Sequence, residues 1–100
     1  IEDWSGFEEV LQCAWHRQLH IFELPFYYIE YAIAQLGALQ VWLNSKRNFK
    51  GAVNDYWSAL QLGGSRPLPQ LFRYAGATFD FGPATLKPLM ERLEAELEAL

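Results

Sequence analysis

Residues 20–40 read HIFELPFYYIEYAIAQLGALQ, and this stretch decides the fold class. It contains no alternation of apolar and polar residues of the kind that predicts a strand. Proline disfavours helix at the residue before it and suits the first turn of a new helix. We therefore expect a helix to begin at Pro25 and to run to about Lys46.

The stretch from Pro25 to Leu43 is long enough to suggest a membrane span. Its polar residues Glu30, Gln35 and Gln40 fall on different sides of a helix, so no continuous lipid-facing stripe remains. We interpret it as a central buried helix, and we expect no membrane partner.

On the N-terminal side, Ser5-Gly6-Phe7-Glu8 has the S-x-x-E form of a capping box. The apolar residues that follow at helical spacing are Phe7, Val10, Leu11, Ala14, Trp15 and Leu19. This pattern predicts a first helix from about Gly6 to Leu19. Cys13 lies inside it, and we interpret this cysteine as a small buried hydrophobic residue.

On the C-terminal side, the sequence predicts a helix over 49–62 that ends at Gly63-Gly64, because glycine readily adopts the left-handed cap conformation. A short helix over 69–74, closed by Gly76, and a final helix from Pro83 to the end complete the chain. We expect an all-α fold of about five helices, with no strand.

The final helix carries apolar residues at alternating spacings of four and three, which is a heptad-like pattern. They are Leu86, Met90, Leu93, Leu97 and Leu100. Acidic residues lie on its other sides, where we expect a solvated face.

Composition limits the partners. Hydrophobic residues make up 51% of the 100 residues and aromatic residues 16%, a large apolar content that suggests surface for another polypeptide and predicts self-association. The net charge is −4 and the eight basic residues are scattered, which argues against nucleic acid. The single cysteine and the lack of a secretory leader pattern favour a cytoplasmic location.

His16 and His20 stand four residues apart, the spacing of a zincin helix. That chemistry also requires a glutamate directly after the first histidine as general base. Arg17 occupies this position, and its guanidinium does not accept a proton. We therefore expect capping or interhelical hydrogen bonds from these histidines rather than a metal site.

His20 is followed by three tyrosines, Tyr27, Tyr28 and Tyr31. On a helix Tyr31 would share a face with Tyr27, four residues before it, and with Tyr28, three residues before it. Three hydroxyl groups on one helix are costly to bury. The tyrosines either line a cleft, where they would donate hydrogen bonds to a developing oxyanion, or pack in the core with their hydroxyls at its rim.

The run from His20 to Gln40 closely resembles the C-terminal region of oligoendopeptidase F-like zinc peptidases, in the thimet oligopeptidase superfamily. The resemblance continues through residues 59–65 and 67–72, and from Phe79-Asp80-Phe81 to the end. It therefore covers nearly the whole chain.

The resemblance implies a largely helical zinc metalloendopeptidase that hydrolyses short peptides in a channel between two lobes. In that family two histidines of an HExxH helix and a glutamate hold zinc. A histidine and tyrosines from a later segment stabilise the tetrahedral intermediate, and His20, Tyr27 and Tyr31 match them. Tyr28 is implied as a neighbouring substrate contact.

No HExxH occurs in these 100 residues. We expect residues 1–100 to form one helical segment, the C-terminal portion of the peptidase domain without its HExxH helix. On this reading zinc belongs to the full-length enzyme, the partners are a peptide substrate and the upstream catalytic lobe, and the isolated chain is inactive. The alternative is a non-catalytic helical interaction module or a degenerate relative.

Gly63 and Gly64 precede Ser65 and admit two interpretations. They form either a plain helix cap and loop or a mobile, substrate-binding loop with backbone N–H groups directed at an anion.

Overall fold

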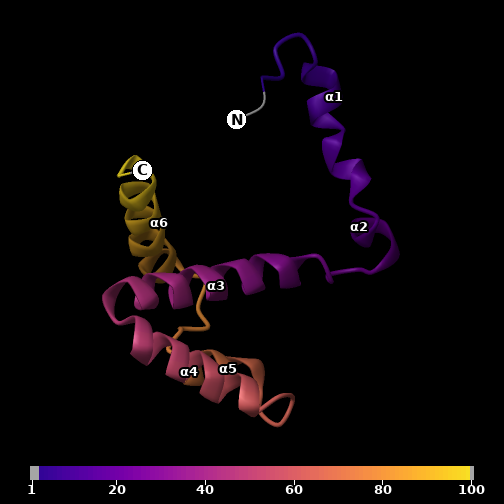
Figure 1. Cartoon of the computed structure of the whole chain (residues 1–100). Helices are drawn as coiled ribbons and strands as arrows, with labels where there is room; N and C mark the ends of the chain where they lie inside the picture. The colour runs from indigo at the N-terminus through magenta and orange to yellow at the C-terminus, as the bar shows by residue number, and fades with distance from the viewer. Residues whose placement is uncertain (1–2, 100) are drawn as a thin grey trace. The chain divides into compact units, whose positions relative to one another are not determined.

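The computed structural model describes residues 3–99 and confirms the all-α class: these residues form six α-helices and one 3-10 helix, with no strand (Figure 1). The elements are α1 (Glu8–Gln12), η1 (Ala14–Arg17), α2 (His20–Glu23), α3 (Ile29–Arg47), α4 (Phe49–Gln61), α5 (Leu68–Tyr74) and α6 (Pro83–Glu98). They divide into two compact units, Ile1–Ala32 and Ile33–Leu100.

In the first unit the predicted continuous helix from Gly6 to Leu19 is wrong. It is broken into α1, η1 and the start of α2, with Gln18 leaving helical geometry at φ −89° and ψ 84°. None of these three short elements contains a buried residue, so packing contributes little to stabilising a longer helix.

The predicted capping box is also wrong. The backbone N–H and the hydroxyl of Ser5 both donate to the carboxylate of Asp3, at 2.9 and 2.6 Å. The N-cap position is taken by Phe7, without a side-chain hydrogen bond, and not by Ser5. Glu8 instead accepts a hydrogen bond from the backbone N–H of Gly6, at 3.0 Å.

Pro25 lies in a tight turn and not in the first turn of a helix as predicted. Leu24 is not helical, with φ −130° and ψ 86°, and its carbonyl accepts a hydrogen bond from Tyr27 N–H at 3.1 Å. Phe26 has a φ of 65°. Proline followed by a residue with positive φ is the pattern of a type II turn, so α3 begins only at Ile29.

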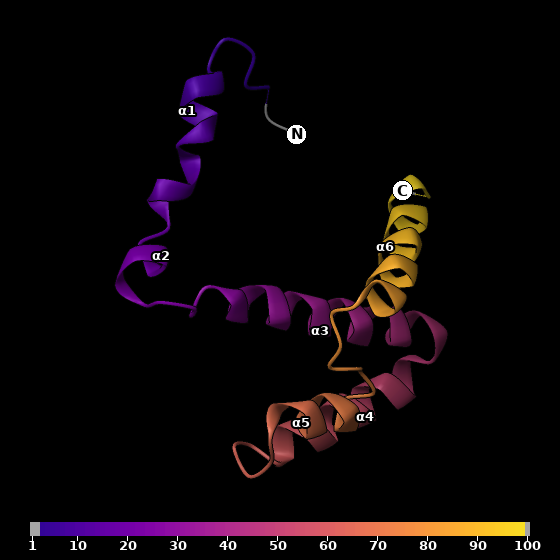
Figure 2. The ribbon, with the colours of Figure 1, turned by 180° about the vertical axis from the view of Figure 1, so that it is seen from behind.

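The second unit follows the sequence prediction closely. Asn48 caps α4 by accepting a hydrogen bond from Gly51 N–H at 3.1 Å. Gly63 and Gly76, with φ of 51° and 71°, follow α4 and α5 in the left-handed conformation expected of them. The two helices pack side by side (Figures 1 and 2).

Two amide side chains on α3 hold the loop that leads from α5 to α6. Gln40 donates to the carbonyl of Thr78 at 3.1 Å and accepts from its N–H at 2.8 Å. One turn further on, Asn44 donates to the carbonyl of Gly76 at 2.8 Å. These hydrogen bonds tether the loop to α3.

The helix α6 is joined to α3 by an ion pair. Leu89 is buried, and Lys46 in the last turn of α3 lies 3.0 Å from the Glu96 carboxylate. Arg92 pairs with the same carboxylate at 3.0 Å. The predicted cation at the C-terminus of α3 is thus present and also bridges two helices.

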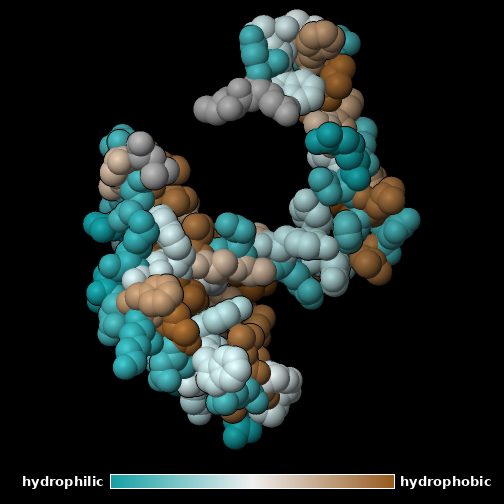
Figure 3. All heavy atoms as spheres, viewed as in Figure 1, coloured by the Kyte–Doolittle hydropathy of each residue, from teal (hydrophilic) through white to brown (hydrophobic). Residues whose placement is uncertain are grey.

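Little apolar surface is buried. Among the described residues only Ala52, Ala77 and Leu89 form a buried hydrophobic core. The prediction of a central buried helix is wrong, because α3 contains no buried residue, and Cys13 is exposed instead of buried. Hydrophobic residues accordingly appear over much of the surface (Figure 3). No helix in residues 3–99 combines the length and hydropathy of a membrane span.

The heptad-like pattern lies on α6 as predicted, and the described residues cover it only in part. Met90 and Leu97 are 41% and 61% exposed, whereas Leu86 and Leu93 are half-buried. Leu100 lies outside the described residues.

Candidate functional site

The histidine and the three tyrosines of the sequence prediction lie together in the first unit. His20 begins α2, Tyr27 and Tyr28 lie in the turn after it, and Tyr31 is in the first turn of α3. The turn at Pro25-Phe26 separates α2 from α3. Beyond it, the tyrosine rings lie close to the ring of His20.

The imidazole of His20 is the centre of this cluster. Its ring centroid is 6.0 Å from that of Tyr27, 5.9 Å from that of Tyr28 and 5.6 Å from that of Tyr31. The Tyr31 ring is in turn 6.1 Å from Tyr27 and 5.3 Å from Tyr28. We call these four residues the His20–tyrosine cluster. The predicted pairing of Tyr27 with Tyr31 occurs, although Tyr27 precedes the helix.

One polar contact connects the cluster. The hydroxyl of Tyr31 lies 3.4 Å from Nε2 of His20, at the long limit of a hydrogen bond. Such contacts are often long in a catalytic site without substrate. Nδ1 of His20 is buried and has no partner among the described residues.

The tyrosines are accessible. Tyr27, Tyr28 and Tyr31 are 41%, 39% and 51% exposed, so the described part of the chain does not bury them as a core. The three phenol hydroxyls and the imidazole of the cluster together offer several hydrogen-bond donors. This arrangement suits binding of carbonyl or carboxylate oxygens.

His16 and His20 lie on different helical elements. The expected helical face shared by His16 and His20 is absent, because His16 belongs to η1 and His20 to α2. No group of three or more His, Cys, Asp or Glu side chains among residues 3–99 is placed to hold a metal ion. His16 instead packs against Trp15, with ring centroids 4.0 Å apart.

Gly63 and Gly64, the predicted substrate-binding glycines, belong to the second unit. Gly63 follows α4 with φ 51° and lines an apolar groove of about 510 Å³ between α3, α4 and α5. A Cβ at Gly64 would meet no atom within 4 Å, so Gly64 is open to solvent. The positive φ supports the helix-cap interpretation of this pair.

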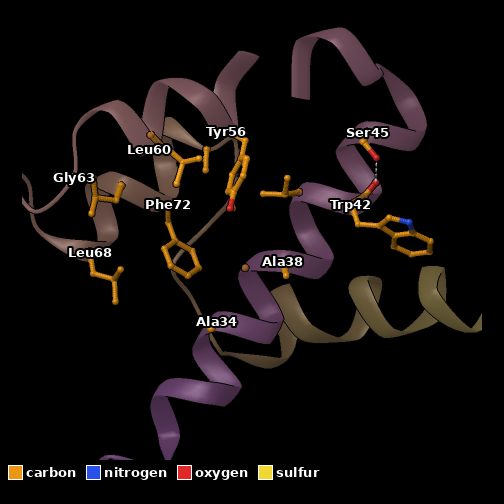
Figure 4. A pocket seen from close by; sticks show the side chains of 15 residues that line it. Ala34, Ala38, Trp42, Ser45, Tyr56, Leu60, Gly63, Leu68 and Phe72 are labelled. Carbon is orange, nitrogen blue, oxygen red and sulfur yellow. Dashed lines mark hydrogen bonds between the residues drawn. The ribbon is translucent and has the colours of Figure 1, made fainter. Parts of the chain in front are cut away.

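The groove was not predicted from the sequence. None of its lining residues is charged, and Figure 4 shows Phe72 of α5 and Tyr56 and Leu60 of α4 directed into the space beside Ala38 of α3. A Cβ at Gly37 would lie 2.9 Å from the Phe72 ring, so glycine permits this close approach. The small residues of α3 in the run AIAQLGA are the signal that indicates a close-packed helix face.

Phe26 is a second feature that sequence reasoning missed. It is 95% exposed and has positive φ, which is strained for a bulky residue. Strained backbone concentrates at functional sites. The signal was the Pro25-Phe26 pair itself, since proline favours position i+1 of a type II turn.

Comparison with known proteins yields no relative: no family model, no curated protein and no solved structure matches the chain.

Proposed function

We propose that this chain is the C-terminal helical part of a zinc metalloendopeptidase that hydrolyses short peptides. Within it the His20–tyrosine cluster binds the substrate backbone and stabilises the transition state. The observation that carries the proposal is the convergence of Tyr27 and Tyr31 on the His20 imidazole, with centroids 6.0 and 5.6 Å away. The resemblance of residues 20–40 to the oligoendopeptidase F family supplies the reaction.

The chemistry follows from the donors. When water adds to a peptide carbonyl, the carbonyl oxygen gains negative charge. A tyrosine hydroxyl or an imidazole N–H aimed at that oxygen stabilises the tetrahedral intermediate more than the ground state. Each such donor contributes about 2.7–4 kcal/mol in a water-excluded site. Tyr28, whose ring centroid is 5.9 Å from that of His20, is assigned to the neighbouring substrate backbone.

The proposal assigns the zinc ion and the general base to residues other than these. The described residues contain no suitable cluster of ligands, and HExxH does not occur in the sequence. A coding sequence that extends upstream of Ile1 and encodes HExxH would support the assignment. The full-length protein would then be a cytoplasmic enzyme whose upstream lobe completes the site.

The decisive experiment compares two tyrosine variants of the full-length protein. Tyr31→Phe removes one hydroxyl and little packing, and we expect kcat on a fluorogenic peptide to fall about 10²–10³-fold. Tyr27→Phe should behave similarly. Tyr74→Phe is the matched control, because Tyr74 and Tyr31 are both 51% exposed. Near-normal kcat in both Tyr27→Phe and Tyr31→Phe would refute the catalytic role.

The second candidate is a non-catalytic helical interaction module. The apolar groove and the exposed apolar residues of the second unit favour it. The same experiment discriminates the two, because a module of this kind would lack peptidase activity in the full-length protein.

A further inference from the structure

The apolar stripe of α6, exposed at Met90 and Leu97, is chemically better defined than the other apolar surfaces of the described residues. The groove between α3, α4 and α5 has no charged lining residue that would specify an occupant. The stripe on α6, in contrast, has charged residues along its open edge. We define it as the α6 seam: Leu86, Met90, Leu93 and Leu97.

The α6 seam lies beside the surface by which α6 contacts its own chain, and Leu86 and Leu93 are half-buried there. Leu89 and Glu96 lie on the side that faces α3. At about 100° per residue the seam is centred roughly 80° from that side, so the two faces adjoin. Pro88, which interrupts the helical hydrogen bonds of α6, lies on the opposite side from the seam. Figure 3 shows hydrophobic residues along one side of α6 and hydrophilic residues along another.

The spacing of the seam assigns heptad positions. Leu86 and Leu93 occupy d, and Met90 and Leu97 occupy a. If a second copy of α6 runs antiparallel, Leu86 lies opposite Leu97 and Met90 opposite Leu93. The same two layers then repeat in reverse order, so the apolar surface is self-complementary about a twofold axis.

The charges beside the seam fit the same register. Lys87 and Glu94 both occupy e, on the open edge of the seam, and both are exposed. In an antiparallel pair e positions face e positions, so Lys87 of each copy meets Glu94 of the other. On the other edge Leu89 is already buried, and Glu96 is bonded to Lys46. In this register no like charges meet along the open edge.

We infer that the α6 seam is a homodimer interface, in which two copies of this chain pair antiparallel through Leu86, Met90, Leu93 and Leu97 and are held in register by reciprocal Lys87–Glu94 ion pairs. The area is that of two short helices, so the dimer is weak. We expect a Kd of about 10–1000 µM.

The test is a charge-swap series on the 100-residue chain, followed by sedimentation equilibrium in reducing buffer. The reductant excludes disulfide dimers through the exposed Cys13. Lys87→Glu places acids opposite acids, and Glu94→Lys places bases opposite bases. Each single variant should raise the Kd about tenfold. The double variant exchanges the two signs and should restore the original Kd.

Mixing the two single variants gives the sharpest result. A heterodimer of Lys87→Glu with Glu94→Lys contains two attractive pairs, so the mixture should associate more tightly than either variant alone. A parallel pair would not give this outcome, because e then faces g. Absence of the restored affinity in both the double variant and the mixture would overturn the proposed register.

A seam variant tests the interface without reference to charge pairing. Leu97→Glu introduces a charge at an a position that is 61% exposed in the single chain, so folding should be little affected and dimerisation lost. Trp57→Glu is the control, since Trp57 is 60% exposed on α4. A chain that is monomeric at all concentrations, or a dimer that persists in Leu97→Glu with unchanged circular dichroism, would overturn the inference.

Discussion

At Phe26 the backbone has a φ of 65° although the side chain is 95% exposed. A residue with a Cβ loses about 1–2 kcal/mol in this conformation, and the exposed ring recovers little of that by packing. The turn is nevertheless what returns Tyr27 to His20. The strain is therefore located where the candidate site depends on it.

Replacing Phe26 with glycine should relieve this strain. Glycine adopts positive φ freely but also gains freedom in the unfolded chain, so we expect a net stabilisation of the turn by up to about 1 kcal/mol. The readout is hydrogen exchange of Tyr27 N–H, which donates to Leu24 in the turn. Protection should rise up to about fivefold in Phe26→Gly and fall in the β-branched Phe26→Val. Unchanged exchange in both variants would contradict the strained turn.

The membership of the candidate site could be predicted from the sequence, whereas its local backbone could not. The spacing of Tyr27, Tyr28 and Tyr31 after His20 indicated a shared surface, and their rings do converge. That Phe26 adopts positive φ depends on competition between the turn and a longer helix. A type II turn usually has glycine where this chain has Phe26, so the residue types alone do not decide between the turn and a longer helix.

At the scale of elements, the carboxylates of Asp80 and Glu96 form hydrogen bonds at the start and near the end of α6, and their protonation in acid should weaken its packing. Hydrogen bonds from the Thr85 hydroxyl and the Gly82 N–H lower the pKa of Asp80. The pKa of Glu96 is lowered chiefly by its hydrogen bond from Lys46. A lowered pKa in the folded state stabilises the fold above the unfolded pKa, and this contribution is lost as the pH falls through the folded value.

We therefore expect the melting temperature to fall as the pH is lowered from about 5 to 3. Asp80→Asn and Glu96→Gln should each lower the melting temperature at pH 7 and flatten the acid part of the profile. Glu98→Gln, which removes a carboxylate elsewhere on α6, should leave the profile unchanged. An acid dependence that is identical in all four proteins would exclude this account.

The sequence predicted α4, α5 and α6 to within one or two residues but not the helices before α3. The later helices have explicit ends: Asn48 and Pro83 at starts, Gly63 and Gly76 at stops. The N-terminal segment has helical spacing but buries nothing in the first unit. Periodicity alone does not hold a helix together when no surface covers its apolar face, which is why the predicted helix over 6–19 is broken.

At the scale of the whole chain, the two histidines are not arranged as a metal site. His16 and His20 lie on different helical elements, and no third ligand joins them among the described residues. We expect equilibrium dialysis of the 100-residue chain to find no stoichiometric zinc site of sub-micromolar affinity. A tight site that disappears in the His16→Ala, His20→Ala double variant would show this expectation to be mistaken.

The paired hydrogen bonds between Gln40 and Thr78 also carry a kinetic consequence. They join residues 38 positions apart, whereas α4 and α5 are joined by a short connection. Closing the longer loop costs more chain entropy, so the α4–α5 hairpin should form first. Once it has formed, fewer conformations remain for the chain between Gln40 and Thr78. The hydrogen bonds between Gln40 and Thr78 then form after the folding barrier. A substitution such as Gln40→Met should therefore speed unfolding and leave the refolding rate in stopped-flow experiments nearly unchanged.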